Sequence, residues 1–531
     1  MTPQGLFSNW PPPSKEILKS WLDRQGIIRD DSLKIVDMED GDGWRLISGR
    51  EMDIGELICS IPKTSILSHR TSSLPPLPPL PSSGSCHDSS MNSITLLHLS
   101  LCLLHEFRLG QSSPFYGYLQ SLPRDIIGLP IFWDVSEVCR EDGKEAKKWL
   151  RGTGAERELR VREEQGLGLT NLHSFYSHYS SHLPPTTSHP EHSPIQSFYH
   201  AFSLISTRAF MIDLYHLIAL CPFADILNHH PTQPNTSLSS DDFVCHLCGS
   251  LKTCPEHDIT NSQGIAYRLL YLIPRDIQRI EDEPQDTIEL RVERPIAKKG
   301  EEVWNSYGDG LSDAKLLVEW GFISEEYTGD GLVWDLEDLH LKGEGEVEEY
   351  WKKVDEAPID PIDEDTEEGE DEEERILCRR NEQNPRLLNL DQSGRISINI
   401  FSLLWLDQTR SRRNGSKECR AEDPGSLVQA IKQIESIWKI SIDEEYTEYD
   451  TLLIDDLVEV IQQVIDLLKK RIEKMYRCDL SEDALFKMRD DLSPEDKYLY
   501  MAMTLSINER VLINSTLNKW NDLLDFIIAS S

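Results

Sequence analysis

The chain has 531 residues, too long for one ordinary domain and long enough for two or three. It carries 54 Lys and Arg against 92 Asp and Glu, a formal net charge of −38. Because such a charge repels phosphate backbones, it excludes a nucleic acid bound through its charge and favours a basic protein partner. No secretory signal opens the chain, no apolar run reaches the roughly 18 residues of a membrane span, and the 11 cysteines are odd in number and scattered. We therefore expect no membrane partner, reduced thiols, and a cytoplasmic or nuclear location, or both.

The elements predicted before residue 330 are mixed in type. In chain order they are a helix at 15–24, short strands at 32–36, 44–48 and 56–62, helices at 94–108 and 198–218, and a half-buried strand at 287–292. The Pro-rich segment 74–84 and the His-, Ser-, Tyr- and Pro-rich segment 173–193 are predicted to be loops. Strands and helices do not alternate regularly, which argues against a doubly wound parallel sheet.

The character of the chain changes after a run of negative charge. Residues 355–374 hold 13 acidic side chains and no basic one, which is typical of a solvated linker. Beyond this run, apolar residues recur at helical spacing over 427–438, 454–472 and 505–517. We predict an α+β domain over 10–330, an acidic linker over 331–375 and a helical domain over 376–531.

Three segments carry more than fold information. The first is Gly41-Asp42-Gly43-Trp44. Two glycines spaced by one residue permit positive φ and let backbone amides approach a ligand closely. The third glycine of the dinucleotide-binding fingerprint is missing, and a glycine pair taken alone is most often a turn.

The second and third segments place polar side chains after apolar ones. Residues 222–230 contain Asp225, Asn228 and His229 and follow Arg208 at the end of an apolar stretch. Taken alone, this group is equally well read as a capping aspartate followed by an Asx turn. Residues 299–308 predict a turn, a short strand and an exposed Asn-Ser-Tyr-Gly that contains Tyr307, and a helix follows at 311–323.

In this order and spacing, the three segments resemble the SET-domain methyltransferases. The resemblance is to the branch that carries a helical Rubisco-methyltransferase-type substrate-binding domain at its C-terminus, and within it to the ribosomal-lysine-methyltransferase type. It covers roughly residues 10–330, and the C-terminal half agrees in character only. The resemblance implies an α+β fold: a β-rich SET domain with a helical insert at about 94–215, followed by an all-α domain.

The resemblance also implies roles for individual residues. The backbone of Gly41, Asp42, Gly43 and Trp44 would line the S-adenosyl-L-methionine pocket, although Asp42 departs from the small or basic residue usual in the family. Arg208 would contact the cofactor carboxylate, which suits a guanidinium. Tyr307 corresponds to the family's tyrosine at the methyl-transfer channel. The remaining residues assigned to the cofactor are Asp225, Asn228, His229 and Phe322.

A separate cluster of soft ligands lies inside this region. Cys245-x-x-Cys248 with Gly249 is followed by Cys254-x-x-His257, so four ligands fall within 13 residues. This spacing suits one tetrahedral Zn²⁺ in a knuckle over 245–257, and the alternative is free thiols in a loop. Such a zinc would be structural, because four protein ligands leave no open position for catalysis.

The leading hypothesis is an S-adenosyl-L-methionine-dependent protein-lysine N-methyltransferase. Its acidic surface favours a basic substrate, a ribosomal protein first and a histone second, bound to a monomeric enzyme. Two alternatives stay open: a protein-histidine N-methyltransferase, which one member of this branch is, and a non-catalytic acidic scaffold or chaperone for basic proteins. The presence of Arg208, Asn228, His229 and Tyr307 argues against the scaffold.

Overall fold

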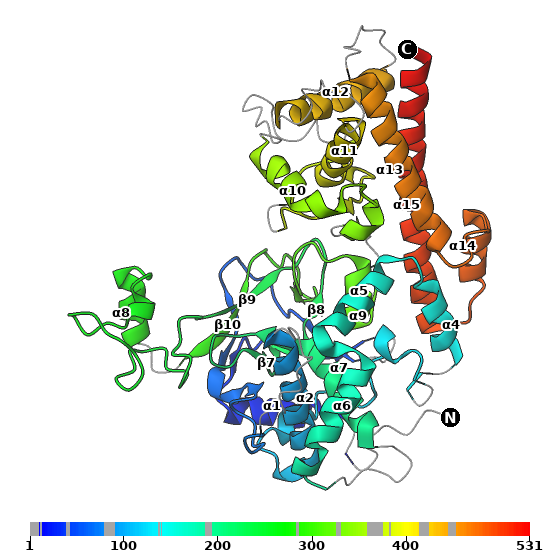
Figure 1. Ribbon diagram of the computed structural model, residues 1–531. Helices are drawn as coiled ribbons and strands as arrows, with labels where there is room; N and C mark the ends of the chain where they lie inside the picture. Colours follow the sequence, from blue (N-terminus) through cyan, green and yellow to red (C-terminus); the bar gives the residue numbers. More distant parts are fainter. Residues whose placement is uncertain are drawn as a thin grey trace. The chain divides into compact units, whose positions relative to one another are not determined.

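Figure 1 shows the computed structural model of the protein. It describes residues 10, 13–38, 43–78, 91–135, 138–139, 141–185, 194–282, 286–324, 331–357, 375–381, 384–413, 424–443 and 453–530. The chain forms two compact units. The first comprises Met1–Arg140, Leu159–Asp309 and Val318–Gly321, and the second comprises Glu141–Glu158, Gly310–Leu317 and Phe322–Ser531. The domain boundaries predicted from the sequence stay a prediction.

Short strands in small sheets form the centre of the first unit. A four-stranded antiparallel sheet has the order β1 (Ile28–Arg29), β4 (Leu57–Pro62), β10 (Thr287–Val292) and β9 (Thr236–Ser240). The other antiparallel pairings join β2 (Lys34–Asp37) to β3 (Trp44–Ile47), and β5 (Leu67–Ser68) and β6 (Ala209–Met211) to β7 (Ile218–Leu220). One described strand pair of this unit is parallel, β8 (Asn228–His229) with β11 (Trp304–Asn305).

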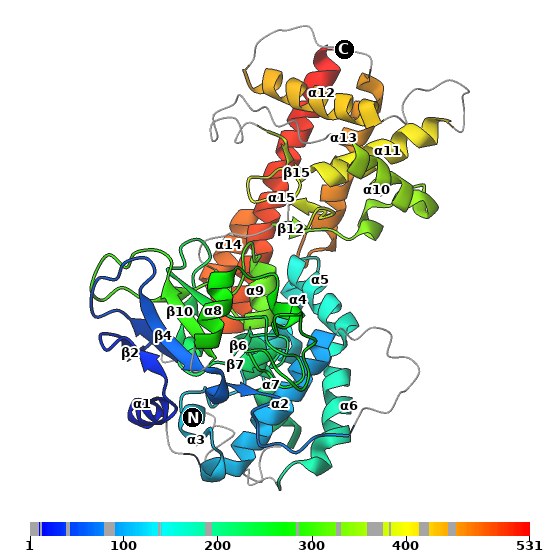
Figure 2. The same cartoon turned by 90° about the vertical axis from the view of Figure 1, so that its left-hand side faces the viewer.

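Helices cover these sheets. Those of the first unit are α1 (Lys15–Arg24), α2 (Met91–Leu109), α3 (Tyr116–Leu119), α6 (Leu169–Tyr179), α7 (Pro194–Arg208) and α8 (Pro274–Asp282). Two more, α5 (Gly154–Arg162) and α9 (Asp313–Trp320), have residues in both units. Helix α2 packs against α6 and α7, and the three lie side by side in Figures 1 and 2. Helix α1 begins where predicted because the hydroxyl of Ser14 accepts a hydrogen bond from the N–H of Ile17.

Two predictions for this unit were wrong over part of their length. The helix predicted at 198–218 ends at Arg208, and the hairpin of β6 and β7 follows. The Asp213 carboxylate accepts hydrogen bonds from the N–H groups of Tyr215 and His216, which stabilises the turn in place of another helical turn. The predicted loop at 173–193 is helical through Tyr179, because Leu172, Phe175, Tyr176 and Tyr179 recur at helical spacing and are buried. Residues 186–193 of that segment lie outside the described part of the chain.

The second unit is mainly helical, as the apolar spacing predicted. Its helices are α4 (Glu141–Trp149), α10 (Val347–Glu356), α11 (Ile398–Arg413), α12 (Pro424–Asp443), α13 (Ile454–Lys474), α14 (Glu482–Asp490) and α15 (Lys497–Ser530). Helix α13 is an example. The apolar residues that recur at helical spacing along it, among them Leu457, Val464 and Leu468, are buried on one face. No described helix combines the length and the apolar content needed to span a bilayer.

A small sheet in this unit was not predicted. Its order is β12 (Leu332–Val333), β14 (Asn389–Leu390), β15 (Ile396–Ser397) and β13 (Leu377–Cys378), and each strand is too short to show an alternating pattern. Residues 331–357, which the sequence assigned to the linker, are folded here and bury Tyr350 and Trp351 of α10. Residues 358–374 of the acidic run lie outside the described residues.

A buried carboxyl group sits inside the second unit. Glu509 of α15 is 2% exposed, and both of its carboxylate oxygens lie 3.0 Å from the backbone nitrogen of Gly154, at the start of α5. Burial raises the pKa of Glu509 to about 7, although Arg471 and the Gly154 N–H favour the ionised form. Burial also raises the pKa of Asp313 to about 6. Both carboxyl groups therefore change charge close to neutral pH.

We expect the stability of the second unit to fall as pH rises through the range in which Glu509 ionises. The folded-state pKa of about 7 lies above the unfolded value, so ionisation favours unfolding between about pH 4.3 and pH 7. The loss should reach about 4 kcal/mol at most, and Glu509→Gln should remove most of it. Urea unfolding measured between pH 5 and pH 8 tests this, with the exposed Glu495→Gln as the matched control. Equal pH dependence in wild type and Glu509→Gln would contradict the assignment.

Candidate active site

Two strands of two residues each bring distant parts of the chain together at the candidate site. Strands β8 and β11 pair in parallel, with Asn228 opposite Trp304 and His229 opposite Asn305. The N–H of His230 donates to the carbonyl of Asn305 at 3.0 Å and continues the ladder. The Asn-His segment and the Asn-Ser-Tyr-Gly segment are far apart in the sequence. In the fold they lie side by side as one strand pair.

Side-chain hydrogen bonds hold this short pair in place. Asn235 accepts from the N–H of Trp304 at 2.8 Å and donates to the carbonyl of Glu302 at 3.0 Å. The Glu302 carboxylate accepts from the Asn228 amide at 2.8 Å and from the Arg45 guanidinium at 3.3 Å. The sequence analysis assigned no role to Asn235 or Glu302, whose partners are brought to them only by the fold.

Tyr307 is fixed at both its backbone and its phenol. Its N–H donates to Nδ1 of His229 at 3.1 Å, and its hydroxyl donates to the carbonyl of Leu227 at 3.1 Å. Its ring stacks between two others, with centroids 5.1 Å from His229 and 5.6 Å from Trp320. A phenol oxygen and a backbone carbonyl oxygen thus lie side by side, which is an arrangement suited to orienting an amine.

The surroundings set the protonation of these groups. Burial raises the pKa of Tyr307 to about 12, so the phenol stays protonated at neutral pH. Burial, with a smaller contribution from His230, lowers the pKa of His229 to about 4. Neutral His229 also fits its hydrogen bond, because Nδ1 can accept from Tyr307 only when it carries no proton.

Arg208 and Asp225 form a second polar group beside this one. Nη1 of Arg208 donates to the backbone carbonyl of Asp225 at 2.6 Å, and the Asp225 carboxylate accepts from the hydroxyl of Tyr118 at 2.8 Å. Burial raises the pKa of Asp225 above its ordinary value, against the opposing effect of Arg208. Asp225 is 6% exposed, so its carboxylate faces the protein interior, whereas the Arg208 side chain is 23% exposed.

The glycine-rich segment lies next to the same strands. The N–H of Val303 donates to the carbonyl of Leu46 in β3 at 2.8 Å, which places the segment leading to β11 beside the strand that starts at Trp44. Gly43 has φ +138°, a conformation that favours glycine, and a Cβ there would meet no atom of the described residues within 4 Å. Gly41 and Asp42 lie outside the described residues.

One of the two rings that stack on Tyr307 belongs to Trp320, the last residue of α9. The sequence analysis gave Trp320 no role. Phe322, to which the resemblance gave adenine stacking, belongs to the second unit, and its role stays a prediction. The other described residues assigned to the cofactor or the reaction all lie in the first unit: Gly43, Trp44, Arg208, Asp225, Asn228, His229 and Tyr307.

The predicted metal ligands come together in the fold. The ligand atoms of Cys245, Cys248, Cys254 and His257 all lie within 4.8 Å of one another. Sγ of Cys254 lies 3.6 Å from Sγ of Cys248 and 3.3 Å from Nδ1 of His257. Around a tetrahedral zinc with Zn–S bonds of about 2.3 Å, sulfurs stand roughly 3.8 Å apart. The cluster can therefore hold a metal ion.

Backbone geometry builds this cluster from two turns. The N–H of Gly249 donates to the carbonyl of Cys245 at 2.7 Å, and Gly249 takes φ +74°, which favours glycine. In the second turn the N–H of Cys254 donates to the Asp258 carboxylate at 2.6 Å. Arg268 binds both oxygens of that carboxylate at 2.9 Å. Outer contacts of this kind orient metal ligands in known sites.

We expect His229 to remain neutral throughout the physiological pH range. Its imidazole should carry a proton on Nε2 alone at pH 6, and protonation near pH 4 should break the hydrogen bond from Tyr307. Because the folded-state pKa is lowered, this residue should reduce stability progressively as pH falls from about 6.5 to about 4. Two-dimensional NMR of ¹⁵N-histidine-labelled protein, assigned with His229→Gln, reports the ring state directly. A doubly protonated ring at pH 6 would contradict the expectation.

Comparisons with known proteins agree with the motifs. No family model matches the chain. It is 26% identical over 331 residues to ribosomal lysine N-methyltransferase 3 of Saccharomyces cerevisiae, covering 52% of this chain and 56% of that one. It is also 26% identical over 261 residues to N-lysine methyltransferase SETD6 of Bos taurus, covering 46% and 52%. The chain thus spans about half the length of the curated relatives it matches.

The similarity in structure extends further along the chain. The crystal structure of the SET domain of LSMT bound to lysine and AdoHcy superposes with a TM-score of 0.54 over 95% of this chain and 90% of that one, at 13% identity. At this identity the match establishes the fold. The resemblance to the SET-domain lysine methyltransferases of the Rubisco-methyltransferase-like branch, and the α+β fold class that it implied, are therefore confirmed.

Proposed function

We propose that this protein is an S-adenosyl-L-methionine-dependent protein-lysine N-methyltransferase. The observation that carries the proposal is the Tyr307 phenol held 3.1 Å from the Leu227 carbonyl, within a fold shared with a SET domain that binds lysine and AdoHcy. The sequence relatives named as lysine methyltransferases support the same activity.

Methyl transfer to a lysine amine requires two things of the protein: it must desolvate the amine and align it with the methyl group. A lysine ammonium has no lone pair, so it must first release a proton, and burial in an apolar channel lowers its pKa. The amine nitrogen then forms a bond to the methyl carbon of the sulfonium cosubstrate as the carbon–sulfur bond breaks, and the electron pair of that bond stays on sulfur. The Tyr307 hydroxyl and the Leu227 carbonyl would orient the nitrogen in line with the methyl group, and this alignment supplies most of the rate.

The residues around Tyr307 fit the cosubstrate. The partly exposed Arg208 guanidinium donates through Nη1 to Asp225, and its Nε has no hydrogen-bond partner among the described residues. A carboxylate is the group that a guanidinium in this state binds best. The backbone at Gly43 and the strand that carries Asn228 and His229 would hold the rest of the molecule. Asp225, being buried against Tyr118, would act by holding Arg208.

The proposed substrate is a basic protein, a ribosomal protein first and a histone second. Support comes from the name of the yeast relative, which is a ribosomal lysine N-methyltransferase, and from the net charge of −38. We propose that the enzyme acts as a monomer in the cytoplasm or the nucleus, where such proteins are synthesised or assembled.

Tyr307→Phe should lower kcat by at least about 100-fold while changing cofactor affinity little, because the phenol oxygen orients the acceptor amine. Ribosomal proteins from cells that lack the enzyme, incubated with labelled S-adenosyl-L-methionine, provide the assay, and mass spectrometry identifies the modified residue. Tyr500→Phe, an exposed tyrosine, is the matched control.

The result separates the alternatives. Label on histidine would support a protein-histidine methyltransferase instead. Wild-type protein that binds ribosomal proteins but neither binds the cofactor nor transfers label would support the scaffold. Full activity in Tyr307→Phe would refute the role of this side chain.

We also propose that the Cys₃His cluster holds one structural Zn²⁺. Three thiolates and one imidazole are the ligand set that zinc prefers, and they complete its tetrahedral shell. In the first unit, this zinc would stabilise the turns at Gly249 and Asp258 without contacting the substrate.

Purified protein should contain one zinc per chain, as measured by elemental mass spectrometry. Cys248→Ser should reduce that content and increase protease cleavage between residues 241 and 286, because the loss of one ligand weakens binding by at least about 10-fold. Cys478→Ser, which alters an exposed cysteine outside the cluster, should leave both unchanged. Metal-free protein with an equally protected 241–286 segment would contradict the proposal.

A further inference from the structure

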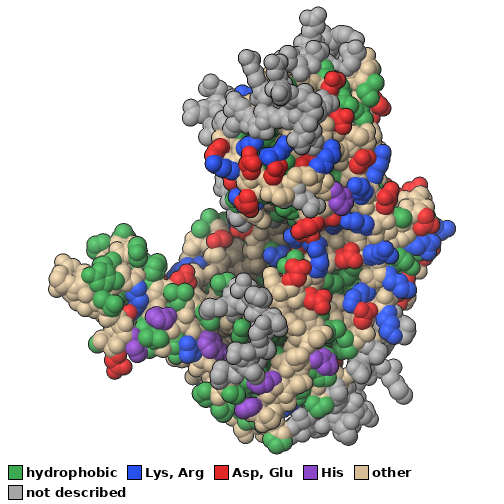
Figure 3. Space-filling view, in the orientation of Figure 1, with side chains coloured by type: hydrophobic (Ala, Val, Ile, Leu, Met, Phe, Trp, Pro, Cys, Tyr) green, Lys and Arg blue, Asp and Glu red, His purple; other side chains and the backbone are tan. Residues whose placement is uncertain are grey.

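The segment that carries the Cys₃His cluster projects from the first unit. It comprises residues 241–286, called the arm here, and it connects β9 to β10. In Figures 1 and 3 the arm, which includes α8, extends to the left of the strands from which it grows.

The arm buries little apolar surface of its own. Its small core consists of Val244, Leu251, Ala266, Leu269 and Ile280. A segment of this size with so few buried apolar side chains needs a further constraint, such as a metal, to hold one structure.

The arm exposes more large apolar side chains than its core of five contains. Seven of the seventeen large hydrophobic residues exposed in the described chain lie in the arm, although the arm is 46 residues of 531. Ile259 is 78% exposed, Tyr271 87% and Ile273 60%. Such a concentration on one projecting segment is typical of an interaction surface. We call these seven residues the arm surface: Phe243, Leu247, Ile259, Tyr267, Leu270, Tyr271 and Ile273.

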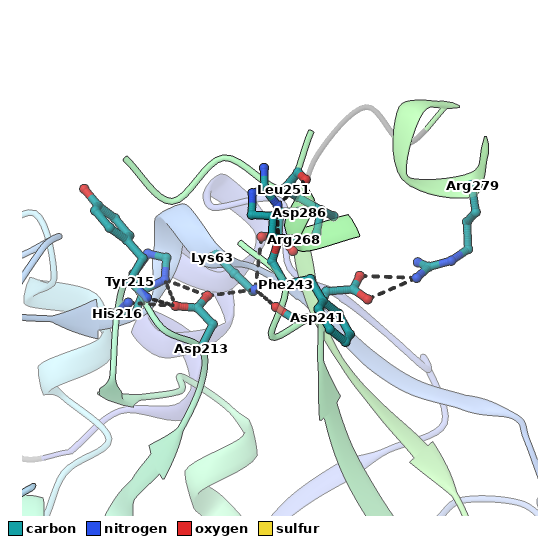
Figure 4. A network of polar contacts seen from close by, with 10 residues as sticks. All are labelled: Lys63, Asp213, Tyr215, His216, Asp241, Phe243, Leu251, Arg268, Arg279 and Asp286. Carbon is teal, nitrogen blue, oxygen red and sulfur yellow. Dashed lines mark hydrogen bonds and ion pairs between the residues drawn. The ribbon is translucent and has the colours of Figure 1, made fainter. Parts of the chain in front are cut away.

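A buried lysine fixes both ends of the arm to the sheet. Nζ of Lys63 donates to the backbone carbonyl of Asp241 at 3.0 Å and binds the carboxylates of Asp286 at 3.0 Å and Asp213 at 2.8 Å (Figure 4). Asp241 and Asp286 are the first and last residues of the arm, and the Lys63 side chain is 4% exposed. Separating a lysine buried this deeply from its three partners would leave charges buried without a counter-charge, so the two ends are held firmly.

A second contact fixes the metal-binding turn. The Tyr215 ring packs so closely on Gly249 that a Cβ there would lie 2.5 Å from Cδ1 of the tyrosine. At the other end of the sheet, the hydroxyl of Thr236 in β9 donates to the carbonyl of Trp304 at 2.8 Å. The five residues of β9 thus run from the candidate active site to the base of the arm, roughly 14 Å apart along the strand. A partner bound to the arm would be held at a fixed distance from Tyr307.

The net charge of the arm indicates which kind of partner can bind to it. Residues 241–286 contain nine acidic and four basic side chains, a net charge of 4 − 9 = −5. Two of the basic ones, Arg268 and Arg279, are paired with Asp258 and Asp241. A second copy of this chain, with its own charge of −38, and an anionic lipid surface would both be repelled. A basic protein that presents apolar side chains is complementary in both respects.

We propose that the arm surface is a docking site for the basic protein substrate of the methyltransferase. The inference rests on the proposed function and names where its substrate binds outside the acceptor site. The apolar side chains supply contact area, the negative charge steers the encounter, and the Lys63 contacts keep the docked protein in register with Tyr307.

The test compares two triple variants with wild type. Ile259→Ser/Tyr271→Ser/Ile273→Ser removes the arm surface at its most exposed positions, and Ile28→Ser/Ile54→Ser/Ile528→Ser alters side chains of similar exposure elsewhere, 64%, 67% and 60%. Two acceptors are used: free lysine, which needs only the acceptor site, and ribosomal protein from cells lacking the enzyme. Binding of each variant to immobilised ribosomal protein is measured separately in a Tyr307→Phe background.

For the arm variant we expect the KM for ribosomal protein to rise by about 10-fold and binding to weaken to match, with kcat and the free-lysine rate unchanged. The control variant should behave as wild type. Unchanged KM and binding would overturn the proposal, and so would an equal loss of the free-lysine rate, which would assign the arm a structural role instead.

Two further outcomes are decided by the same experiment. If wild type methylates neither acceptor, the proposed function fails, and the binding measurement still decides the docking site. If sedimentation velocity shows a wild-type dimer that the arm variant loses, the surface serves self-association and the proposal is overturned.

Discussion

The candidate site depends on one short interaction, the parallel pairing of β8 with β11. Two residues from each strand form it, and the paired residues are 76 positions apart along the chain. Such a pair has almost no stability of its own, so its position is maintained by Asn235, by Glu302 and by the neighbouring strand β3. Once the pair is in place, His229 lies against Tyr307 and the Tyr307 phenol reaches the Leu227 carbonyl.

The same constraint explains the electrostatics of the site. The groups nearest the phenol are held in a largely apolar setting, and burial keeps both Tyr307 and His229 uncharged at neutral pH. An uncharged lining is what a reaction that consumes a neutral amine requires, because a fixed anion there would stabilise the ammonium form of the lysine. The positive charge of the site is on Arg208, whose side chain is partly exposed and can bind an anionic group of a ligand.

The arm is stabilised differently from the rest of the first unit. The first unit has a core of many large buried side chains, whereas the arm has a core of five and depends on local constraints. Local contacts hold it instead: two tight turns bring the four residues of the Cys₃His cluster together, and the buried Lys63 binds both ends of the arm. Because few apolar side chains of the arm are used in its core, others face outward.

The sequence by itself determined the elements with strong local signals, the family resemblance and the four residues of the Cys₃His cluster. Helix α1 and strand β10 lie where spacing placed them, because amphipathic periodicity and a capping serine act within a few residues. The spacing of the Cys-x-x-Cys and Cys-x-x-His pairs likewise predicted that the four side chains come together, because a knuckle is a local structure.

Only the tertiary structure decided the rest. It ended α7 at Arg208, because the turn at Asp213 is stabilised by side-chain hydrogen bonds and by Lys63, which lies 150 residues away. It folded residues 331–357, which had been assigned to the linker that contains the acidic run 355–374, by burying Tyr350 and Trp351. It also brought Glu302 to Asn228 and Trp320 to Tyr307. Contacts between residues far apart in the chain leave no periodic trace in it, because their energy is realised only when the fold closes the intervening loop.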